Sequence, residues 1–279
     1  MNLLTFDIED WFHCDMSSCY KTWDNYQSRL PECTDRILGL LEDHNLTATF
    51  FVLGWIGKKH PKTIQKIADA GHEIGAHSDL HRIVFEMQPD VFKQDTENVI
   101  KTLQDTVGAP ITMYRAPAFS ITQQTPWAFD CLAESGITID CSIFPMVRDY
   151  GGFLGNSFEG PLRIKRGQTT VKEFPINTAK FCTSKIVFSG GGYFRLTPYW
   201  LIHYLTKKSE YVMTYFHPRD FDQDQPVLTH LSWKRRFKSY YGLRTAYRKL
   251  ERFVQDFDFV SVGTADREID WSHTPTIDL

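Results

Sequence analysis

The chain has 279 residues, of which 42% are hydrophobic and 14% aromatic, so it can form a packed core and is not a disordered protein. Its 31 Lys and Arg residues against 34 Asp and Glu give a formal net charge of −3 without a marked run of like charge. The overall charge therefore gives no case for a nucleic-acid partner, an anionic-membrane partner or a polyanionic substrate.

The first half of the chain alternates strand-like runs with helical patterns, which indicates βα units and parallel strands. Strands are predicted over residues 3–7, 47–53, 72–76 and 137–143, with another ending near Tyr114. Helices are predicted over residues 34–45, 61–70, 90–106 and 125–135. In such folds the chemistry sits at the carboxyl ends of the strands, which is where we look for functional residues.

The pattern degrades from about Arg148, where the Gly-rich stretches 150–153 and 189–195 are predicted to be loops flanking a strand-like run at 171–176. A helix over 198–208 and a strand over 211–216 follow. A long basic and aromatic helix is predicted over 232–256, and residues 259–262 could form a last strand. Since neither a linker nor a repeat divides the chain, we expect one domain over residues 1–279.

Several features favour a cytoplasmic protein. The apolar stretches are too short to span a bilayer, and no basic and apolar leader precedes the first predicted strand. The six cysteines form no CxxC pair, which fits reduced thiols better than a disulfide framework. They are Cys14, Cys19, Cys33, Cys131, Cys141 and Cys182.

Three carboxylates, Asp7, Glu9 and Asp10, follow the first predicted strand. In an apolar setting they need a cation or hydrogen-bond donors, and the alternative is a solvated acidic turn. His77 and His81 follow a later strand and would share one face if the segment turns helically, which suits two imidazoles on one metal; a structural role is the alternative. Two histidines and one carboxylate leave positions open for water and substrate.

Two further side chains stand at predicted strand ends. His217, fixed by the proline after it, is a natural general acid or base. The guanidinium of Arg115 could hold a catalytic carboxylate ionised and oriented. Considered alone, each of these two side chains could equally be an ordinary packed and hydrogen-bonded residue.

Together and in this order, these segments resemble the NodB-type polysaccharide deacetylases, carbohydrate esterase family 4. Thr5-Phe-Asp7 resembles the first motif of the family, and residues 48–54 resemble its second strand. Residues 70–81 resemble its HxxxH motif, Tyr114-Arg-Ala-Pro its third motif and Phe216-His217-Pro218 its last. The resemblance covers residues 1–145 and 211–220 and leaves about 221–279 as a C-terminal extension. Residues 7–13 with 190–195 look like a subgroup found with exopolysaccharide and lipopolysaccharide biosynthesis loci.

The resemblance implies an α/β fold, a distorted (β/α) barrel with an elaborated C-terminal half. It also implies a divalent metal, expected to be zinc (Zn²⁺), and hydrolysis of an N-acetyl group from an amino sugar. The substrate would be polymeric, oligomeric, lipid-linked or nucleotide-linked. A same-fold hydrolase of another amide or of an O-acetyl ester is one alternative, and a non-catalytic glycan-binding protein is another.

Carried over residue by residue, Asp7 matches the general base of the family and Arg115 the residue that orients it. His77 and His81 match the metal ligands, and His217 the general acid.

The chain departs from the family at the metal carboxylate, because Ile8 stands where a second Asp is usual. Glu9 is one candidate, since strand alternation places it on the same side as Asp7, and Asp10 is the other. Asp140 matches the place of the fourth motif and is expected to tune His217 or to cap a turn.

Sugars stack on aromatic rings and bond to polar rims, so Trp11, Tyr193, Phe194 and Arg195 are candidates for the substrate cleft. The alternative is that these aromatics are core and that residues 189–192 are a flexible turn. The basic segment 234–238 is expected to be a solvated helix face; contact with membrane headgroups or a lipid-linked pyrophosphate is the alternative.

Overall fold

The computed structural model describes residues 1–15, 20–148, 150–153, 160–181 and 183–279. Cys19 and Cys182 lie outside these ranges. The other four cysteines, Cys14, Cys33, Cys131 and Cys141, are free thiols. Within the described ranges, no helix combines the length and apolarity needed to cross a membrane.

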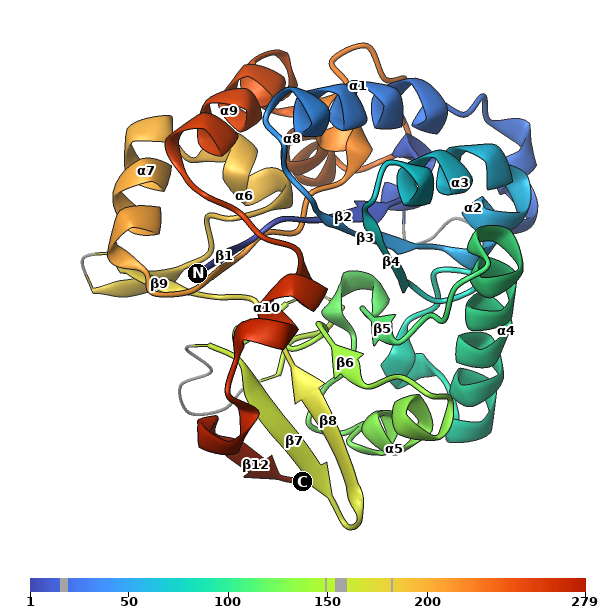
Figure 1. Ribbon diagram of the computed structural model, residues 1–279. Coiled ribbons are helices and arrows are strands. Elements are labelled where there is room, and N and C mark those ends of the chain that lie inside the picture. The colour runs from blue at the N-terminus through green and yellow to red at the C-terminus, as the bar shows by residue number, and fades with distance from the viewer. Residues whose placement is uncertain (16–19, 149, 154–159, 182) are drawn as a thin grey trace.

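A curved eight-stranded sheet forms the centre of the molecule, in the order β12-β7-β8-β6-β5-β4-β3-β2 (Figure 1). All its neighbouring strands are parallel except the antiparallel pair β7–β8. The strands are β2 (Thr5–Ile8), β3 (Thr49–Val52), β4 (Glu73–Ala76), β5 (Met113–Tyr114), β6 (Ile139–Asp140), β7 (Leu162–Arg166), β8 (Thr169–Glu173) and β12 (Thr276–Asp278). Strands β2 and β3 are buried along their whole length, as parallel strands covered on both faces are.

The other edge of β2 pairs with a segment from the far end of the chain. β1 (Asn2–Leu3) pairs in parallel with β11 (Val212–Met213), and single bridges continue this ladder from Phe6 to Phe216 and from Tyr215 to Gly190. Among the described residues no strand pair joins Gly190 to the β12 edge. The expected α/β fold with a distorted barrel is confirmed; within the described ranges the barrel is open, because the two ends of the curved sheet are not bonded to each other.

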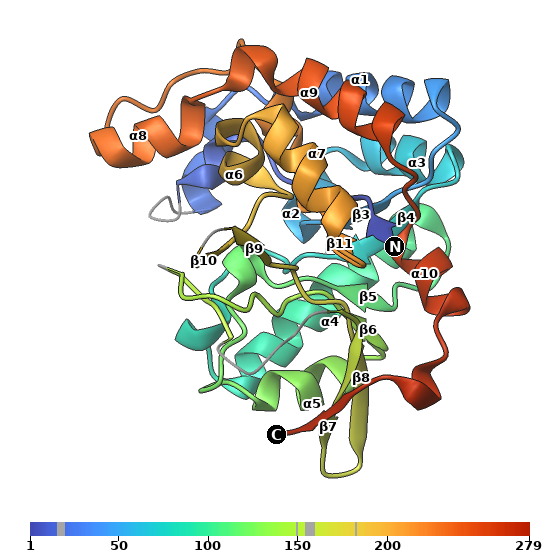
Figure 2. The same ribbon diagram turned by 90° about the vertical axis from the view of Figure 1, so that its left-hand side faces the viewer.

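Helices pack around this sheet and around β11 (Figures 1 and 2). They are α1 (Leu30–Asp43), α2 (Gly54–Lys59), α3 (Pro61–Asp69), α4 (Pro89–Val107), α5 (Trp127–Glu134), α6 (Gly191–Leu196), α7 (Tyr199–Lys208), α8 (Trp233–Tyr240), α9 (Leu243–Asp256) and α10 (Val262–Glu268). Helix α4 shows how the sequence sets their limits: Pro89 occupies its first turn, and Gly108 ends it at a φ of 68°. The hairpin β9 (Ala179–Phe181) and β10 (Ser184–Ile186) stands apart from the large sheet.

The stretch 189–195, predicted to be a loop, contains most of helix α6. A run of glycines carries no helical signal, so the helix was missed. It is held by Phe194, which is fully buried with its ring centroid 4.8 Å from that of Phe216 and 5.5 Å from that of Phe253. Gly190 is required for another reason, because a Cβ there would lie 2.5 Å from the carbonyl oxygen of Tyr215.

Two further expectations for the second half are wrong. The single helix predicted over 232–256 is two helices, α8 and α9, because Gly242 between them has a φ of 78°. The strand predicted over 259–262 is only a bridge between Val260 and Leu3, and α10 begins at Val262. Strand β12 and helix α2 were not predicted.

Candidate active site

The polar residues singled out above converge at the carboxyl ends of neighbouring strands. Glu9 follows β2, His77 and His81 follow β4, Arg115 follows β5, and His217 follows the β11 segment. This is the edge where parallel α/β sheets hold their chemistry. The parallel register of β2, β3 and β4 sets which of these side chains meet.

Glu9, His77 and His81 form a three-residue cluster. The carboxylate Oε1 of Glu9 lies 3.0 Å from Nε2 of His77 and 2.9 Å from Nε2 of His81, and one ligand atom from each residue lies within 4.8 Å of the others. The two imidazoles do not meet through the helical turn we expected. Instead Ser78 and His81 adopt positive φ angles of 65° and 54°, which fold the segment back on itself.

The donor set of this cluster fits a divalent cation. Nδ1 of His77 lies 2.7 Å from the carbonyl oxygen of Arg115, which can only accept, so Nδ1 carries the proton. Nε2 of His77 faces the Glu9 carboxylate at 3.0 Å, so a proton or a cation must lie between these two atoms. Two imidazole nitrogens and one carboxylate, with further positions open, suit Zn²⁺ in particular.

The structure distinguishes the two candidate carboxylates. Oδ1 of Asp10 accepts hydrogen bonds from the backbone N–H groups of Trp11 at 2.9 Å and Arg29 at 3.2 Å, so this side chain caps the short helix Trp11–Cys14. Burial raises the pKa of Asp10 despite these bonds. Burial would also raise the pKa of Glu9, but the charges of His81 and His217 and hydrogen bonds from the imidazoles hold it well below its usual range. The carboxylate in the cluster is thus that of Glu9.

Asp7 and Arg115 form a buried ion pair beside the cluster. Arg115 Nη1 donates to Oδ1 of Asp7 at 2.7 Å and to the hydroxyl of Thr5 at 2.8 Å. The guanidinium is fully buried and lies over the ring of Phe51, 4.2 Å from its centroid. This charge-assisted hydrogen bond fixes the orientation of the Asp7 carboxylate. The second oxygen of Asp7 lies 3.9 Å from Nε2 of His217, so it faces the remaining site residues.

His217 is oriented by Asp220. Oδ2 of Asp220 accepts from both the ring Nδ1 and the backbone N–H of His217, each at 2.9 Å. The other ring nitrogen, Nε2, lies 4.0 Å from Oε1 of Glu9. Burial lowers the pKa of His217, but the charge and hydrogen bond of Asp220, followed by Glu9 and Asp7, outweigh burial and raise that pKa to about 9. The imidazole therefore holds a proton on Nε2 at neutral pH.

The partner expected for His217, Asp140, lies elsewhere. It accepts from the hydroxyl of Ser142 at 2.6 Å and from its backbone N–H at 3.2 Å, and it shares a hydrogen bond with Glu173. Burial raises the pKa values of both acids. Sequence reasoning missed Asp220, although a carboxylate three residues after His217 with a proline between them is the spacing of a capping box.

Arg195, expected at the substrate cleft, lies behind Asp220. Its Nε is 3.1 Å from Oδ1 of Asp220, and the side chain is only 2% exposed. Its other nitrogens donate to the carbonyl groups of Lys238, Ser239 and Tyr241 at about the same distance. The charges of Arg195 and His217 overcome burial and hold the pKa of Asp220 well below its usual range. Arg195, Asp220 and His217 thus form a connected chain of charges.

Of the three expected aromatic wall residues, two are interior. Trp11 is 5% exposed and its indole N–H donates to the carbonyl of Gln27 at 3.0 Å. Phe194 is fully buried in the core, whereas Tyr193 is 45% exposed. The core alternative therefore holds for Trp11 and Phe194.

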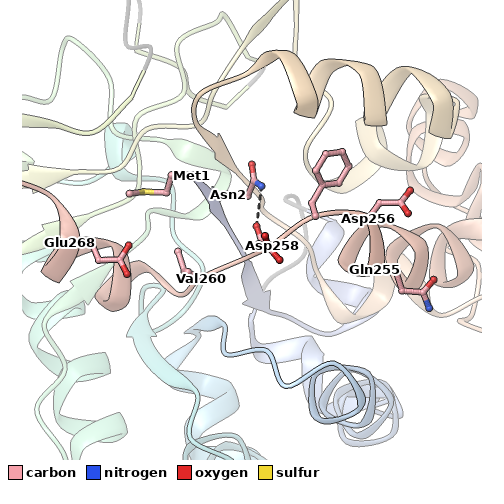
Figure 3. Close-up of a pocket in the computed structure, with 8 residues that line it drawn as sticks. Met1, Asn2, Gln255, Asp256, Asp258, Val260 and Glu268 are labelled. Atoms are coloured by element: carbon pink, nitrogen blue, oxygen red, sulfur yellow. Dashed lines mark hydrogen bonds between the residues drawn. The ribbon is translucent and has the colours of Figure 1, made fainter.

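A surface pocket of about 470 Å³ lies next to the start of β1 (Figure 3). Met1, Asn2 and the connection around Asp258 line it, and Asn2 Nδ2 donates to the carbonyl of Asp258 at 3.0 Å. It holds none of the predicted site residues, so the candidate active site remains the cluster at the carboxyl ends.

Comparison with known proteins divides the chain near residue 140. Residues 14–134 match the polysaccharide deacetylase family model, and residues 141–266 match a domain of unknown function, DUF3473. His77, His81 and Arg115 lie in the first range. His217, Asp220 and Arg195 lie in the second, whereas Asp7 and Glu9 precede both.

Two curated relatives match the first half. A chitooligosaccharide deacetylase of Rhizobium leguminosarum bv. trifolii is 31% identical over 122 residues, which cover 43% of this chain and 53% of that protein. A peptidoglycan-N-acetylglucosamine deacetylase of Bacillus cereus is 31% identical over 139 residues, which cover 48% of this chain and 50% of that protein. The chain thus spans about half the length of the curated relatives it matches. These matches support a relationship with polysaccharide deacetylases.

A solved structure matches the whole chain. A Mycobacterium smegmatis protein assigned to the polysaccharide deacetylases superposes with a TM-score of 0.67 at 20% identity, covering 100% of this chain and 92% of that one. At this low sequence identity, the structural similarity shows only that the two chains share a fold.

Proposed function

We propose that the protein is a metal-dependent N-deacetylase that removes acetyl groups from an amino-sugar glycan or its precursor. The observation that carries this proposal is the convergence of Glu9, His77 and His81 with the Asp7–Arg115 and His217–Asp220 pairs at one sheet edge. The matched relatives, which by name act on chitooligosaccharide and peptidoglycan, support this class of substrate.

The finer parts of the proposal concern the metal, the glycan and the compartment. The nitrogen and oxygen ligands support zinc. We propose a bacterial surface polysaccharide, or its lipid-linked or nucleotide-linked precursor, as the substrate, and the cytoplasm as the compartment. The free thiols among the described residues support a reducing compartment.

Glu9, His77 and His81 would hold the cation. A divalent cation there supplies Lewis acidity, which lowers the pKa of a water and stabilises negative charge on the acetyl carbonyl oxygen. Asp7, held in place by Arg115, accepts a proton from the attacking water. Arg115 also bonds Thr5, so the carboxylate is fixed in orientation before substrate arrives.

His217 completes the reaction by giving the proton on Nε2 to the departing nitrogen. Without that proton the amine would have to leave as an anion. Asp220 fixes the ring so that Nε2, and not Nδ1, faces the site. The water oxygen bonds to the acetyl carbon, the C–N bond breaks, and the products are acetate and a free amino sugar.

The test is parallel detection of acetate and free amine from N-acetylglucosamine oligomers, lipid-linked and nucleotide-linked N-acetyl sugars, and an O-acetylated sugar. We expect equal acetate and amine from an N-acetyl substrate, with loss in Asp7→Asn, in His81→Ala and after chelation. Acetate from the O-acetyl sugar alone would support the esterase alternative. Stoichiometric metal without turnover on any donor would overturn the deacetylase proposal in favour of a glycan-binding protein.

A further inference from the structure

Helix α8 exposes an aromatic face that the proposed function does not use. Trp233, Phe237 and Tyr241 are spaced four residues apart and so lie along one side of the helix and its end. Their exposures are 74%, 50% and 50%, and the rings of Phe237 and Tyr241 lie 4.9 Å apart. Figure 2 shows α8 at the outer edge of the molecule, well away from the sheet.

The same helix is strongly basic. Four of its eight residues are Lys or Arg and none is Asp or Glu, although the overall net charge of the chain is −3. Lys234, Arg236 and Lys238 are exposed on α8, and within the described part of the chain none of them forms an ion pair. The net charge of the whole chain thus conceals a local excess of cations.

The inner side of α8 is anchored, so its outer side is held in place. Arg235 Nη2 donates to the carbonyl of Cys14 at 2.9 Å. At the other end, Arg195 donates to the carbonyls of Ser239 and Tyr241, and Arg219 to that of Ser239 at 3.3 Å. Only Ser239 of the helix is buried. Packing therefore accounts for few of its aromatic and cationic side chains.

We infer that the face formed by Trp233, Lys234, Arg236, Phe237, Lys238 and Tyr241, the α8 face, binds an anionic lipid surface. Aromatic rings seat at the level of the headgroups, while Lys and Arg attract anionic phosphates. A neutral N-acetylated glycan would use the rings but would leave three cations unpaired, so charge complementarity favours the lipid. This inference concerns binding and stands apart from the catalytic proposal.

The α8 face is linked to the candidate active site through Arg195. This one guanidinium contacts Asp220, which holds His217, and also the carbonyls at the end of α8. Arg195 therefore joins the inner side of α8 to the His217 end of the site by direct contacts.

Co-sedimentation of the full chain with vesicles tests the inference without any turnover. We expect binding to phosphatidylcholine vesicles that contain phosphatidylglycerol, weak binding to phosphatidylcholine alone, and release by salt. The double variants Trp233→Ser/Phe237→Ser and Lys234→Glu/Lys238→Glu should each weaken binding at least tenfold. Both change exposed side chains, and thermal unfolding checks that they fold like the wild type.

Trp200→Ser on α7 is the matched control, because Trp200 is also an exposed helical tryptophan, at 66%. Its binding should equal that of the wild type. Absence of wild-type sedimentation, or equal losses in Trp200→Ser and the α8 variants, would overturn the inference. The face would be assigned to glycan instead if the protein binds N-acetylglucosamine oligomers independently of charge and Trp233→Ser/Phe237→Ser loses that binding. It would be assigned to a second copy if the protein forms dimers without vesicles and the same variant loses them.

Discussion

Replacing Asp220 by Asn should separate the role of the general acid from the rest of the site. A His217 pKa of about 9 in place of 6.5 corresponds to about 3 kcal/mol favouring the imidazolium, at 1.36 kcal/mol per pKa unit. Among the groups that raise the pKa of His217, Asp220 contributes most, ahead of Glu9 and Asp7. We therefore assign to Asp220 about 2 kcal/mol of the stabilisation of the imidazolium. An Asn side chain cannot hold the ring of His217 in the same charged hydrogen bond, so we expect part of the ~10²–10⁴-fold that a positioned general acid supplies to be lost, about 30-fold in kcat.

The assay compares two leaving groups. An N-acetyl sugar needs a proton on its departing nitrogen, whereas an aryl acetate such as p-nitrophenyl acetate releases a stable anion. We expect Asp220→Asn to lower kcat about 30-fold on the N-acetyl sugar and less than about 3-fold on the aryl acetate.

The pH profile gives a second readout. Asp220 raises the pKa of His217, so its loss should move the alkaline limb of the kcat profile to lower pH. The pKa of His217 is higher in the folded chain, about 9, than in the unfolded chain, about 6.5. The ion pair with Asp220 therefore contributes fully to the free energy of unfolding below pH 6.5, and this contribution is lost as the pH rises through about 9.

Asp222→Asn is the matched control, because Asp222 lies two residues further on and bonds Arg29 rather than His217. It should leave the ratio of the two activities unchanged. The reasoning fails if Asp220→Asn slows both substrates equally, or if Asp140→Asn gives the amide-selective loss instead.

Further predictions concern the metal ligands and the core. Glu9→Gln should lose stoichiometric zinc, measured by metal analysis after dialysis, and retention of zinc would contradict the ligand assignment. Asp10→Ala should keep the zinc but lose about 1 kcal/mol of helix-cap stability in urea unfolding. Phe194→Ala should cost about 3–5 kcal/mol of stability and leave KM of the folded fraction unchanged, whereas a raised KM would favour a cleft position. Gly190→Ala should destabilise by roughly 1–3 kcal/mol, since its Cβ would press on Tyr215.

The first half of the fold was predictable because its parallel strands are short apolar runs closed by clear helix signals. Thr49–Val52 has no polar side chain other than Thr49, and Gly108 ends the following long helix at a left-handed φ. Since such strands share one carboxyl edge, the sequence order of Glu9, His77 and Arg115 already indicated that they would meet.

The second half was less predictable because its determinants are contacts between distant segments. Helix α6 depends on burial of Phe194, and a glycine-rich stretch shows no periodicity that would reveal it. Asp220 was not predicted as the partner of His217, because the contact depends on how His217 leaves its strand, and family resemblance pointed to Asp140. The local spacing of His217 and Asp220 was the better guide, because the turn after Pro218 brings them together.

The pairing of β2 with residues near Phe216 has a consequence for biosynthesis. The backbone N–H of Asp7 donates to the carbonyl of Phe216, 2.7 Å away in space and about three quarters of the chain away in sequence. At about 5–20 residues per second on the ribosome, the first strand waits roughly 10–40 s for that neighbour. During this time the edge that carries the proposed base and Glu9 is unpaired and open to misassembly. A nascent chain stalled before residue 211 could therefore not assemble the site, and its first strand would keep an open edge.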